Sequence, residues 1–265
     1  MKENFKVAAG ILVLSVALAL PVAAQTQGQN GMSPTDAKIL HDVQAKISDH
    51  PSLKNVKASV EDRLVTLTGS VDTFYDKLRA GRILNDVNDQ EQGVRNLLEV
   101  AGPNVPDDQL RNKLADRLRY DRIDQGIMFN NFALQVHNGD VTIDGQARTD
   151  SDRDSALGIV ETTKGVKNVV DNIKVLPTSN FDDDLRVNIA RAIYGNPALR
   201  KYANDPQAPI RIVVDNGHVT LAGVVDSQMD KQIAENQAKS VSGVFSVKDN
   251  LVVSNQSNMA GNSAH

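Results

Sequence analysis

The stretch "NGHVTLAGVV", residues 216–225, has the pattern of a tight turn followed by a β-strand, and the chain repeats it. "NGDVTIDGQA" stands at residues 138–147 and "DRLVTLTGSV" at residues 62–71. The copies lie roughly 77 residues apart, well beyond the about 20 to 50 residues of most solenoid repeats. Each copy is therefore predicted to belong to a small domain of its own.

Alternating apolar residues on both sides of the turn predict a β-hairpin in each copy. In the third copy Ile212 and Val214 precede the pair Asn216-Gly217, and the alternation resumes after it. Asn-Gly favours a hairpin because both central residues of a type I′ turn need a positive φ angle. The first copy has Asp62-Arg63 at this place, so its hairpin is predicted to be less tightly specified.

Two sets of glycines recur at fixed places in the repeat. One set lies in or just beyond the second hairpin strand, where a missing side chain indicates a bulge or a close backbone approach: Gly69, Gly145 and Gly223. The other set stands before a valine and is predicted to cap the end of a second helix: Gly93, Gly165 and Gly243. Both sets are interpreted as structural rather than ligand-binding.

Helical periodicity precedes each hairpin. Three apolar trios recur at steps of four residues: Ile39, Val43, Ile47; Leu110, Leu114, Leu118; and Leu185, Ile189, Ile193. Asp36, Asp107 and Asp182 stand near the predicted helix starts and are expected to cap them. The acidic run at residues 182–184 is assigned to a helix start, because it lacks the alternating, glycine-containing loop of a calcium site.

The repeated unit is helix, strand, turn, strand, helix, strand. This order predicts an α+β protein of three tandem small αββαβ domains, each a three-stranded mixed sheet with two helices on one face. The boundaries are residues 35–102, 107–177 and 182–254, here called the first, second and third domain. The first domain is divergent, because residues 97–100 lose the alternating phase and leave its last strand in doubt. The short joints predict that neighbouring domains touch.

The first 24 residues have the pattern of a secretory signal peptide. Lys2 and Lys6 precede an apolar run at residues 7–20, and small residues 22–24 follow. The sequence contains no cysteine, which excludes disulfides and lipid attachment to a cysteine. A protein that is exported to the periplasm, soluble and not lipid-anchored is therefore expected. Residues 25–34 and 255–265 are polar and are predicted to be disordered.

Composition argues against nucleic-acid binding and catalysis. The net charge is -4 and aromatic residues make up 4% of the chain, with no tryptophan, so neither a basic surface for the nucleic-acid backbone nor a stacking platform for its bases is expected. The five histidines show no paired metal-ligand spacing, and phosphate-binding glycine loops are absent. No enzymatic activity, metal or cofactor is expected.

The motif V-T-L-x-G-x-V after the turn and G-V-x-x-V-x-[DN]-x-[LI]-x-V at the close resemble the BON domain family. The resemblance implies non-catalytic envelope proteins that act under osmotic or membrane stress by binding phospholipid or other envelope components. The chain departs from lipid-anchored members because it has no lipidation cysteine. It also carries three repeats where two are usual.

Two binding hypotheses follow. One is binding to anionic phospholipid through a basic helix, with Lys113 and Arg117 flanking its apolar stripe and the other cations facing away: Arg111, Lys113, Arg117, Arg119 and Arg122. Aspartates interleave these cations, so an ordinary charged helix surface is the alternative. The other hypothesis is a chaperone-like or protein-interaction role, in which sheet edges or grooves between domains receive unfolded or partner chains.

Overall fold

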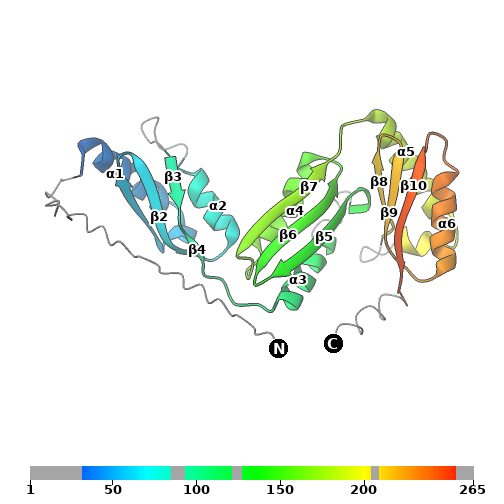
Figure 1. Ribbon diagram of the computed structural model, residues 1–265, viewed down its shortest axis with the longest axis horizontal. Coiled ribbons are helices and arrows are strands. Elements are labelled where there is room, and N and C mark those ends of the chain that lie inside the picture. Colours follow the sequence, from blue (N-terminus) through cyan, green and yellow to red (C-terminus); the bar gives the residue numbers. More distant parts are fainter. Residues whose placement is uncertain (1–31, 85–92, 121–126, 204–208, 255–265) are drawn as a thin grey trace, which may run out of the picture.

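The computed structural model describes residues 32–84, 93–120, 127–203 and 209–254, which form three α+β domains in a row (Figure 1). The first domain contains α1 (Pro34–Ser48), η1 (Pro51–Leu53), β1 (Val56–Glu61), β2 (Leu64–Val71), α2 (Phe74–Arg82), β3 (Gly93–Asn96) and β4 (Glu99–Val100). The second contains α3 (Asp107–Tyr120), η2 (Ile127–Phe129), β5 (Asn131–His137), β6 (Asp140–Ala147), α4 (Asp150–Thr162) and β7 (Asn168–Val175). The third contains α5 (Asn180–Gly195), η3 (Arg200–Ala203), β8 (Arg211–Asp215), β9 (His218–Val225), α6 (Gln228–Lys239) and β10 (Ser246–Val253).

Each domain has a mixed sheet with the second hairpin strand in the middle. In the second domain β5 pairs antiparallel with β6, and β7 pairs parallel with β6 on its other side. The third domain repeats this arrangement with β8, β9 and β10. The helix between the two parallel strands is the crossover that parallel pairing requires. The predicted fold class is confirmed, and the first strand of each domain lies at a sheet edge.

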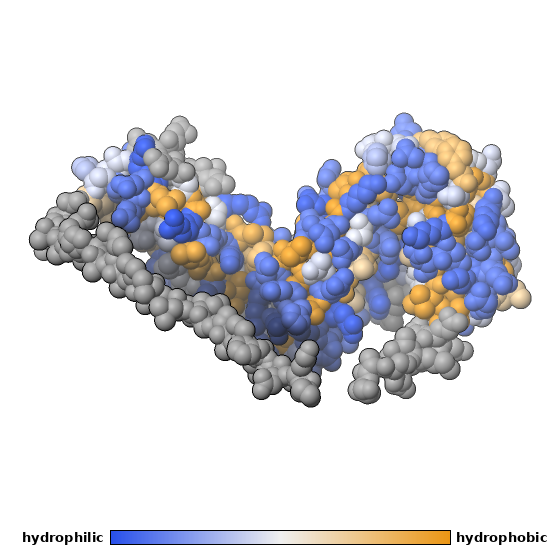
Figure 2. All heavy atoms as spheres, in the orientation of Figure 1, coloured by the Kyte–Doolittle hydropathy of each residue, from blue (hydrophilic) through white to orange (hydrophobic). Residues whose placement is uncertain are grey.

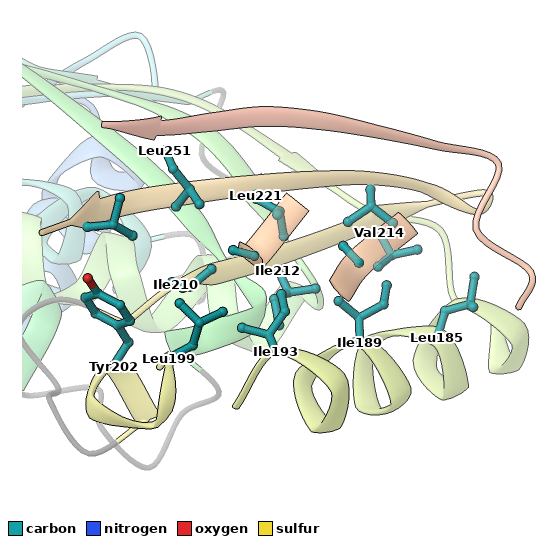
Figure 3. Close-up of a cluster of buried hydrophobic side chains, with 14 of the residues drawn as sticks. Leu185, Ile189, Ile193, Leu199, Tyr202, Ile210, Ile212, Val214, Leu221 and Leu251 are labelled. Carbon is teal, nitrogen blue, oxygen red and sulfur yellow. The ribbon is translucent and has the colours of Figure 1, made fainter. Parts of the chain in front are cut away.

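The apolar trios of the first helices lie in the domain cores. In the third domain Leu185, Ile189 and Ile193 point from α5 toward Val214 and Leu221 on the sheet (Figure 3). All five of these residues are buried. The corresponding trios of α1 and α3 are buried in the same way. Each domain therefore has an apolar core of its own, as a chain without disulfides requires.

The three hairpin turns share one backbone conformation although their residues differ. Asn138 and Asn216 have φ angles of 53° and 50° and are followed by glycines with positive φ. In the first domain Asp62 and Arg63 adopt φ angles of 50° and 64° without a glycine. A positive φ is unfavourable for residues with a side chain, so the first turn depends more on its surroundings.

Aspartates at the starts of the first helices hold these turns instead of capping their own helices. The carboxylate of Asp182 accepts hydrogen bonds from the backbone N–H groups of Asn216 and Gly217, both at 2.9 Å. The helix is capped by Ser179, whose hydroxyl accepts a bond from the Asp182 N–H at 3.2 Å. The capping role predicted for Asp182 was therefore wrong. A carboxylate is well placed here because two turn N–H groups converge on it.

The other two domains use the same aspartate position. Asp107 accepts bonds from the N–H groups of Asn138 and Gly139 at 2.7 and 3.0 Å, and the first of these bonds lowers the pKa of Asp107. Asp36 accepts one bond, from the Arg63 N–H at 2.9 Å. Ser33 caps α1 in place of Asp36, so the end of the segment predicted to be disordered is part of the helix start.

Gly145 lies where two strands approach closely. Its φ angle is 133°, and a Cβ atom there would stand 2.0 Å from the carbonyl oxygen of Asn131 on the hairpin partner. Gly69 and Gly223 have the same surroundings, with distances of 2.2 and 2.7 Å to a backbone oxygen. A side chain at this position would push the edge strand away from the middle strand.

The second set of glycines does not cap helices directly. The C-cap residues of α4 and α6 are Thr163 and Ser240, and Gly165 and Gly243 lie in the turns that follow, with positive φ. Gly93 is the first residue of β3. The predicted capping role was wrong because the chain turns a few residues after the helix end, where it must lead into the last strand.

The last strand of the first domain is present in two pieces. Both β3 and β4 pair parallel with β2, and the pairing is interrupted at residues 97–98. Leu98 is 2% exposed and Leu97 is 56% exposed, so the interruption places one leucine in the core and the other in solvent. The lost alternation in the sequence reflects this interruption.

Neighbouring domains touch, as the short joints predict. Phe74 at the start of α2 packs into the core of the second domain, and Met128 and Phe129 of η2 pack against the core of the third. The Arg148 Nε atom lies 2.9 Å from an oxygen of Asp183 across the second junction. Figure 2 shows a mostly hydrophilic face with separate apolar patches and a hollow between the first and second domains.

Within the described residues, no helix has the length and apolar character needed to cross a membrane. The predicted signal peptide and the predicted disordered C-terminal segment lie outside the described residues.

Candidate functional site

A pocket of about 210 Å³ opens between α3 and the edge strand β5 of the second domain. Ala115 and Leu118 line it from the helix, and Phe132 and Leu134 line it from the strand. Its polar lining comes from the second and third domains: Arg111, Asn112, Arg119, Asn130 and Arg211. This set of nine residues is called the arginine pocket below.

Arg211 brings the third domain into the arginine pocket. It is the first residue of β8, and the flanking residues Ile210 and Ile212 are buried in the third domain's own core. Successive side chains on a strand point to opposite faces, so Arg211 points away from that core, where α3 lies. The pocket therefore depends on how the two domains dock.

The pocket carries an excess of positive charge. Within the part of the chain that the structure describes, Arg111 and Arg211 form no ion pair or hydrogen bond. Arg119 faces Asp116 at 3.8 Å, an exposed pair of little energetic weight. Burial, and then the neighbouring charge of Arg119, lower the pKa of Arg211. A guanidinium stays protonated in proteins, so these groups would gain from an anion between them.

The same groove is built differently in the third domain. The residue after the last apolar trio member is Arg119 in the second domain and Tyr194 in the third. The Tyr194 hydroxyl donates a hydrogen bond of 2.6 Å to the Ile210 carbonyl, the strand residue equivalent to Phe132. Burial raises the pKa of Tyr194, which keeps the phenol neutral. Tyr194 thus fills the position that is polar and charged in the second domain.

The first domain leaves this groove open. Ser48 occupies the position of Arg119 and Tyr194, and its hydroxyl donates to the carbonyl of Ala45 in its own helix. A groove of about 630 Å³ follows, between α1, η1 and the edge strand β1. Lys54 and Lys57 stand at this groove beside the apolar Ile47 and Val56.

The five cations predicted to bind lipid have different surroundings. Arg111 and Arg119 line the pocket beside Leu118, so the prediction that they face away from the apolar stripe was wrong. Lys113 is exposed on α3. Arg117 donates hydrogen bonds to the Ile159 carbonyl at 3.2 Å and to the Thr163 hydroxyl at 2.7 Å. Arg122 lies outside the described residues.

Arg117 therefore has a structural contact. Thr163 is buried at the end of α4, and its hydroxyl donates a hydrogen bond of 2.7 Å to the Ile159 carbonyl. Arg117 adds a further donor to the polar groups at the end of α4. Substituting it would perturb the packing of α3 on α4 as well as the surface charge.

Sequence reasoning missed Arg211, Asn130 and Phe132 as members of the site. The alternation around β8 shows that Arg211 points away from its own core, but this pattern is common to exposed strand residues. Its proximity to Arg119 follows from the docking of the third domain, which no local pattern records.

The described residues hold no group of three or more His, Cys, Asp or Glu side chains able to bind a metal ion. In the acidic run at residues 182–184, Asp182 holds the hairpin turn, and Asp183 pairs with Arg148 and Arg186. His218 lies beside a turn and bonds to the Ser246 hydroxyl at 2.8 Å. These contacts are structural.

Three segments of the chain, residues 35–102, 106–177 and 182–255, match the family described as the BON domain. The chain is similar to osmotically-inducible protein Y of Escherichia coli, with 29% identity over 119 residues, which cover 42% of this chain and 56% of that protein. It is also similar to an Anaplasma centrale protein described as an uncharacterized protein in the gshII 5′ region. That match has 24% identity and covers 53% of this chain and 94% of that protein.

Among solved structures, the C-terminal domain of CdsD, a structural protein of the type III secretion system of Chlamydia trachomatis, aligns with 13% identity and a TM-score of 0.24. The alignment covers 81% of this chain and 96% of that one.

Proposed function

The chain belongs to the BON domain family, and from this premise we propose that it is an exported, non-catalytic protein that protects the cell envelope under osmotic or membrane stress. It does so by binding anionic phospholipid surfaces. The similarity to osmotically-inducible protein Y supports the link to osmotic stress. The leader pattern at residues 1–24 supports export to the periplasm.

The observation that carries this proposal is the cluster of cations around α3. The whole chain has a net charge of -4, so it is repelled by an anionic membrane unless positive charge is concentrated locally. Arg111, Arg119 and Arg211 supply such a concentration beside apolar residues of α3 and β5. Each cation near an anionic bilayer contributes about 1 kcal/mol, so a few together give measurable, salt-dependent binding.

Co-sedimentation with vesicles tests the proposal. The chain without its predicted signal peptide, residues 25–265, is mixed with vesicles of phosphatidylglycerol and phosphatidylcholine, or of phosphatidylcholine alone, over a salt series. Binding to the anionic vesicles is expected, and it should weaken as salt screens the charges. Reversing two pocket cations in Arg111→Glu/Arg119→Glu should abolish it. Absence of binding to anionic vesicles would overturn the proposal.

The matched control reverses two arginines outside the cluster. Arg191→Glu/Arg200→Glu makes the same change of charge on α5 and η3 of the third domain. It should leave vesicle binding near the wild-type level. Arg117 is left intact because its bonds to the end of α4 would confuse a loss of binding with a loss of structure. Equal loss in both double variants would show a net-charge effect and would contradict the role of α3.

A second candidate is a protein-interaction or chaperone-like role, supported by the open groove of the first domain. The groove of about 630 Å³ runs beside the edge strand β1, and apolar side chains including Leu53 and Val56 line it. An edge strand offers unpaired backbone groups to an extended peptide. Suppression of aggregation of an unfolding client without lipid, lost on Ala58→Glu, would support this role. Client aggregation that stays unchanged over a wide range of protein-to-client ratios would exclude this role.

A further inference from the structure

We infer that the arginine pocket is a binding site for a phosphate group carried on a small apolar moiety, and that Arg211 of the third domain completes it. This inference deepens the proposed function and rests on it, because Arg111 and Arg119 take part in both. It adds a ligand chemistry and a requirement for two docked domains. A flat basic surface would not select an apolar phosphate ester, and it would not need the third domain.

The polar lining fits an oxyanion. The three guanidinium groups come from two elements of different domains, α3 and β8. Guanidinium groups present planar pairs of N–H donors that match phosphate oxygens, and they remain charged when partly desolvated. Asn112 and Asn130 also line it, and the side-chain oxygen of Asn130 already accepts a hydrogen bond from the Arg148 N–H at 2.7 Å. No carboxylate lines this pocket among the described residues, so an anion entering it meets no side chain of its own charge.

The size of the pocket limits the ligand. The pocket has a volume of about 210 Å³, whereas pockets for drug-sized ligands begin at about 300 Å³. It can therefore enclose a phosphate with the first atoms attached to it, and the rest of a larger molecule must remain outside. A phospholipid could enter with its head group, whereas its acyl chains would stay in the bilayer.

The apolar lining favours a phosphate ester over inorganic phosphate. Phe132 and Leu134 on β5 face Ala115 and Leu118 on α3 at the same opening. These side chains offer no hydrogen bonds to a fully hydrated ion, but they can bury the carbon atoms of an ester. The ester should therefore bind more tightly than the free ion.

The third domain is held in place by contacts away from the pocket. Met128 and Phe129 of η2 pack against its core, and Arg148 pairs with Asp183. Lys174 of β7 pairs with Asp215 at the end of β8 at 2.8 Å. These contacts place Arg211 opposite Arg119, so a ligand that binds both should also strengthen the docking of the two domains.

Isothermal titration calorimetry of residues 25–265 tests the inference with three soluble probes. The probes are inorganic phosphate, dihexanoyl phosphatidylglycerol below its micelle concentration, and dihexanoyl phosphatidylcholine. The anionic ester is expected to bind most tightly and inorganic phosphate more weakly. The zwitterionic ester should bind least, since its own cation is repelled by the arginines.

Arg211→Gln is the decisive variant. It should weaken binding of the anionic ester about tenfold or more, the loss expected when one charge-assisted hydrogen bond is removed. Arg211 forms no hydrogen bond or ion pair within the described residues, so the variant should keep the wild-type melting temperature. Arg191→Gln, an arginine on the exposed surface of α5, is the matched control and should bind like the wild type.

The outcomes separate this inference from the proposed function. Wild-type affinity of Arg211→Gln for the anionic ester would overturn the inference, even if vesicle binding through α3 persists. Binding of the soluble ester that is lost in Arg211→Gln would support the inference, even if the chain failed to bind vesicles and the proposed function fell. Equal affinity for the anionic and zwitterionic esters would also overturn it, because the arginines would then contribute nothing.

Discussion

The second and third domains share one fold and one groove, but they use the groove in opposite ways. In the second domain Arg119 lines a charged pocket that stays open between α3 and the edge strand β5. In the third domain Tyr194 fills the same place and bonds to the Ile210 carbonyl. The comparison shows that this position is not needed for the fold itself. We expect the residue at this position to decide whether the groove closes as part of the core or stays open to solvent.

The largest expected effect on stability comes from disturbing the pairing of β5 with β6, which forms the strand side of the groove in the second domain. Gly145→Ala places a Cβ atom against the Asn131 carbonyl in a left-handed backbone conformation. The clash and the strain together should cost about 4 kcal/mol or more in the free energy of unfolding of this domain. Urea unfolding of wild type and variant measures the loss.

Gly158→Ala on α4 is the control for Gly145→Ala. A Cβ atom there meets nothing within 4 Å, and alanine is the better helix former. A gain of about 0.5 to 1 kcal/mol is expected. Equal effects of the two substitutions would contradict the close backbone approach at Gly145.

A smaller effect should follow from opening the closed groove of the third domain. Tyr194→Ser gives it the residue that the first domain carries at Ser48. Lost packing and the lost hydrogen bond to Ile210 should cost about 3 kcal/mol, while Tyr194→Phe should cost about 1 kcal/mol. Differential scanning calorimetry measures both variants.

If the comparison holds, Tyr194→Ser also creates a groove that a dye for apolar surface can enter. Increased fluorescence of such a dye over the wild type is the expected result. A variant as stable as the wild type, with unchanged dye binding, would show that Tyr194 does not close the groove.

The smallest effect concerns the junction that brings Arg211 to the pocket. The hydrogen bond from Arg148, and then that from Arg186, lower the pKa of Asp183 below its ordinary value. A lowered pKa means that the folded state favours the charged carboxylate. The contribution is therefore full above the unfolded pKa of about 3.9, and it is lost as the pH falls through the lower folded value.

Asp183→Asn should remove this pH dependence. Arg148 is more than a third exposed and its share should stay below about 1 kcal/mol, but the buried Arg186 also loses its charged partner, so a total loss of about 2 kcal/mol at pH 7 is expected. The melting temperatures of wild type and Asp183→Asn should differ most near neutral pH, and the difference should shrink as the pH falls below the unfolded pKa of about 3.9. A difference that stays constant from pH 7 to pH 3 would argue against the ion pair.

The elements of the fold could be predicted because their signals are local. The apolar trio of α5 has helical spacing, and the pair Asn216-Gly217 specifies a type I′ turn through its own backbone preferences. Asp182 shows where local reasoning stops. An aspartate near a helix start is an ordinary cap, but here Ser179 caps the helix and the carboxylate reaches a turn more than thirty residues away.

The candidate site could be predicted in part. Arg111 and Arg119 were selected from the sequence as cations on one helix, and both line the pocket. Arg117 was selected for the same reason, yet its contacts are with the end of α4. Helical spacing gives the direction of a side chain around its own axis, but it does not say which element lies opposite.

The sequence by itself determined the three domains, their order of elements and the apolar stripe of each first helix, because periodicity and turn chemistry act over a few residues. Tertiary structure alone decided that Arg211 meets Arg119, that Tyr194 closes one groove and that Asp182 holds a turn. The physical reason is that these contacts join residues far apart in the chain. Their distance depends on how finished helices, strands and whole domains pack together.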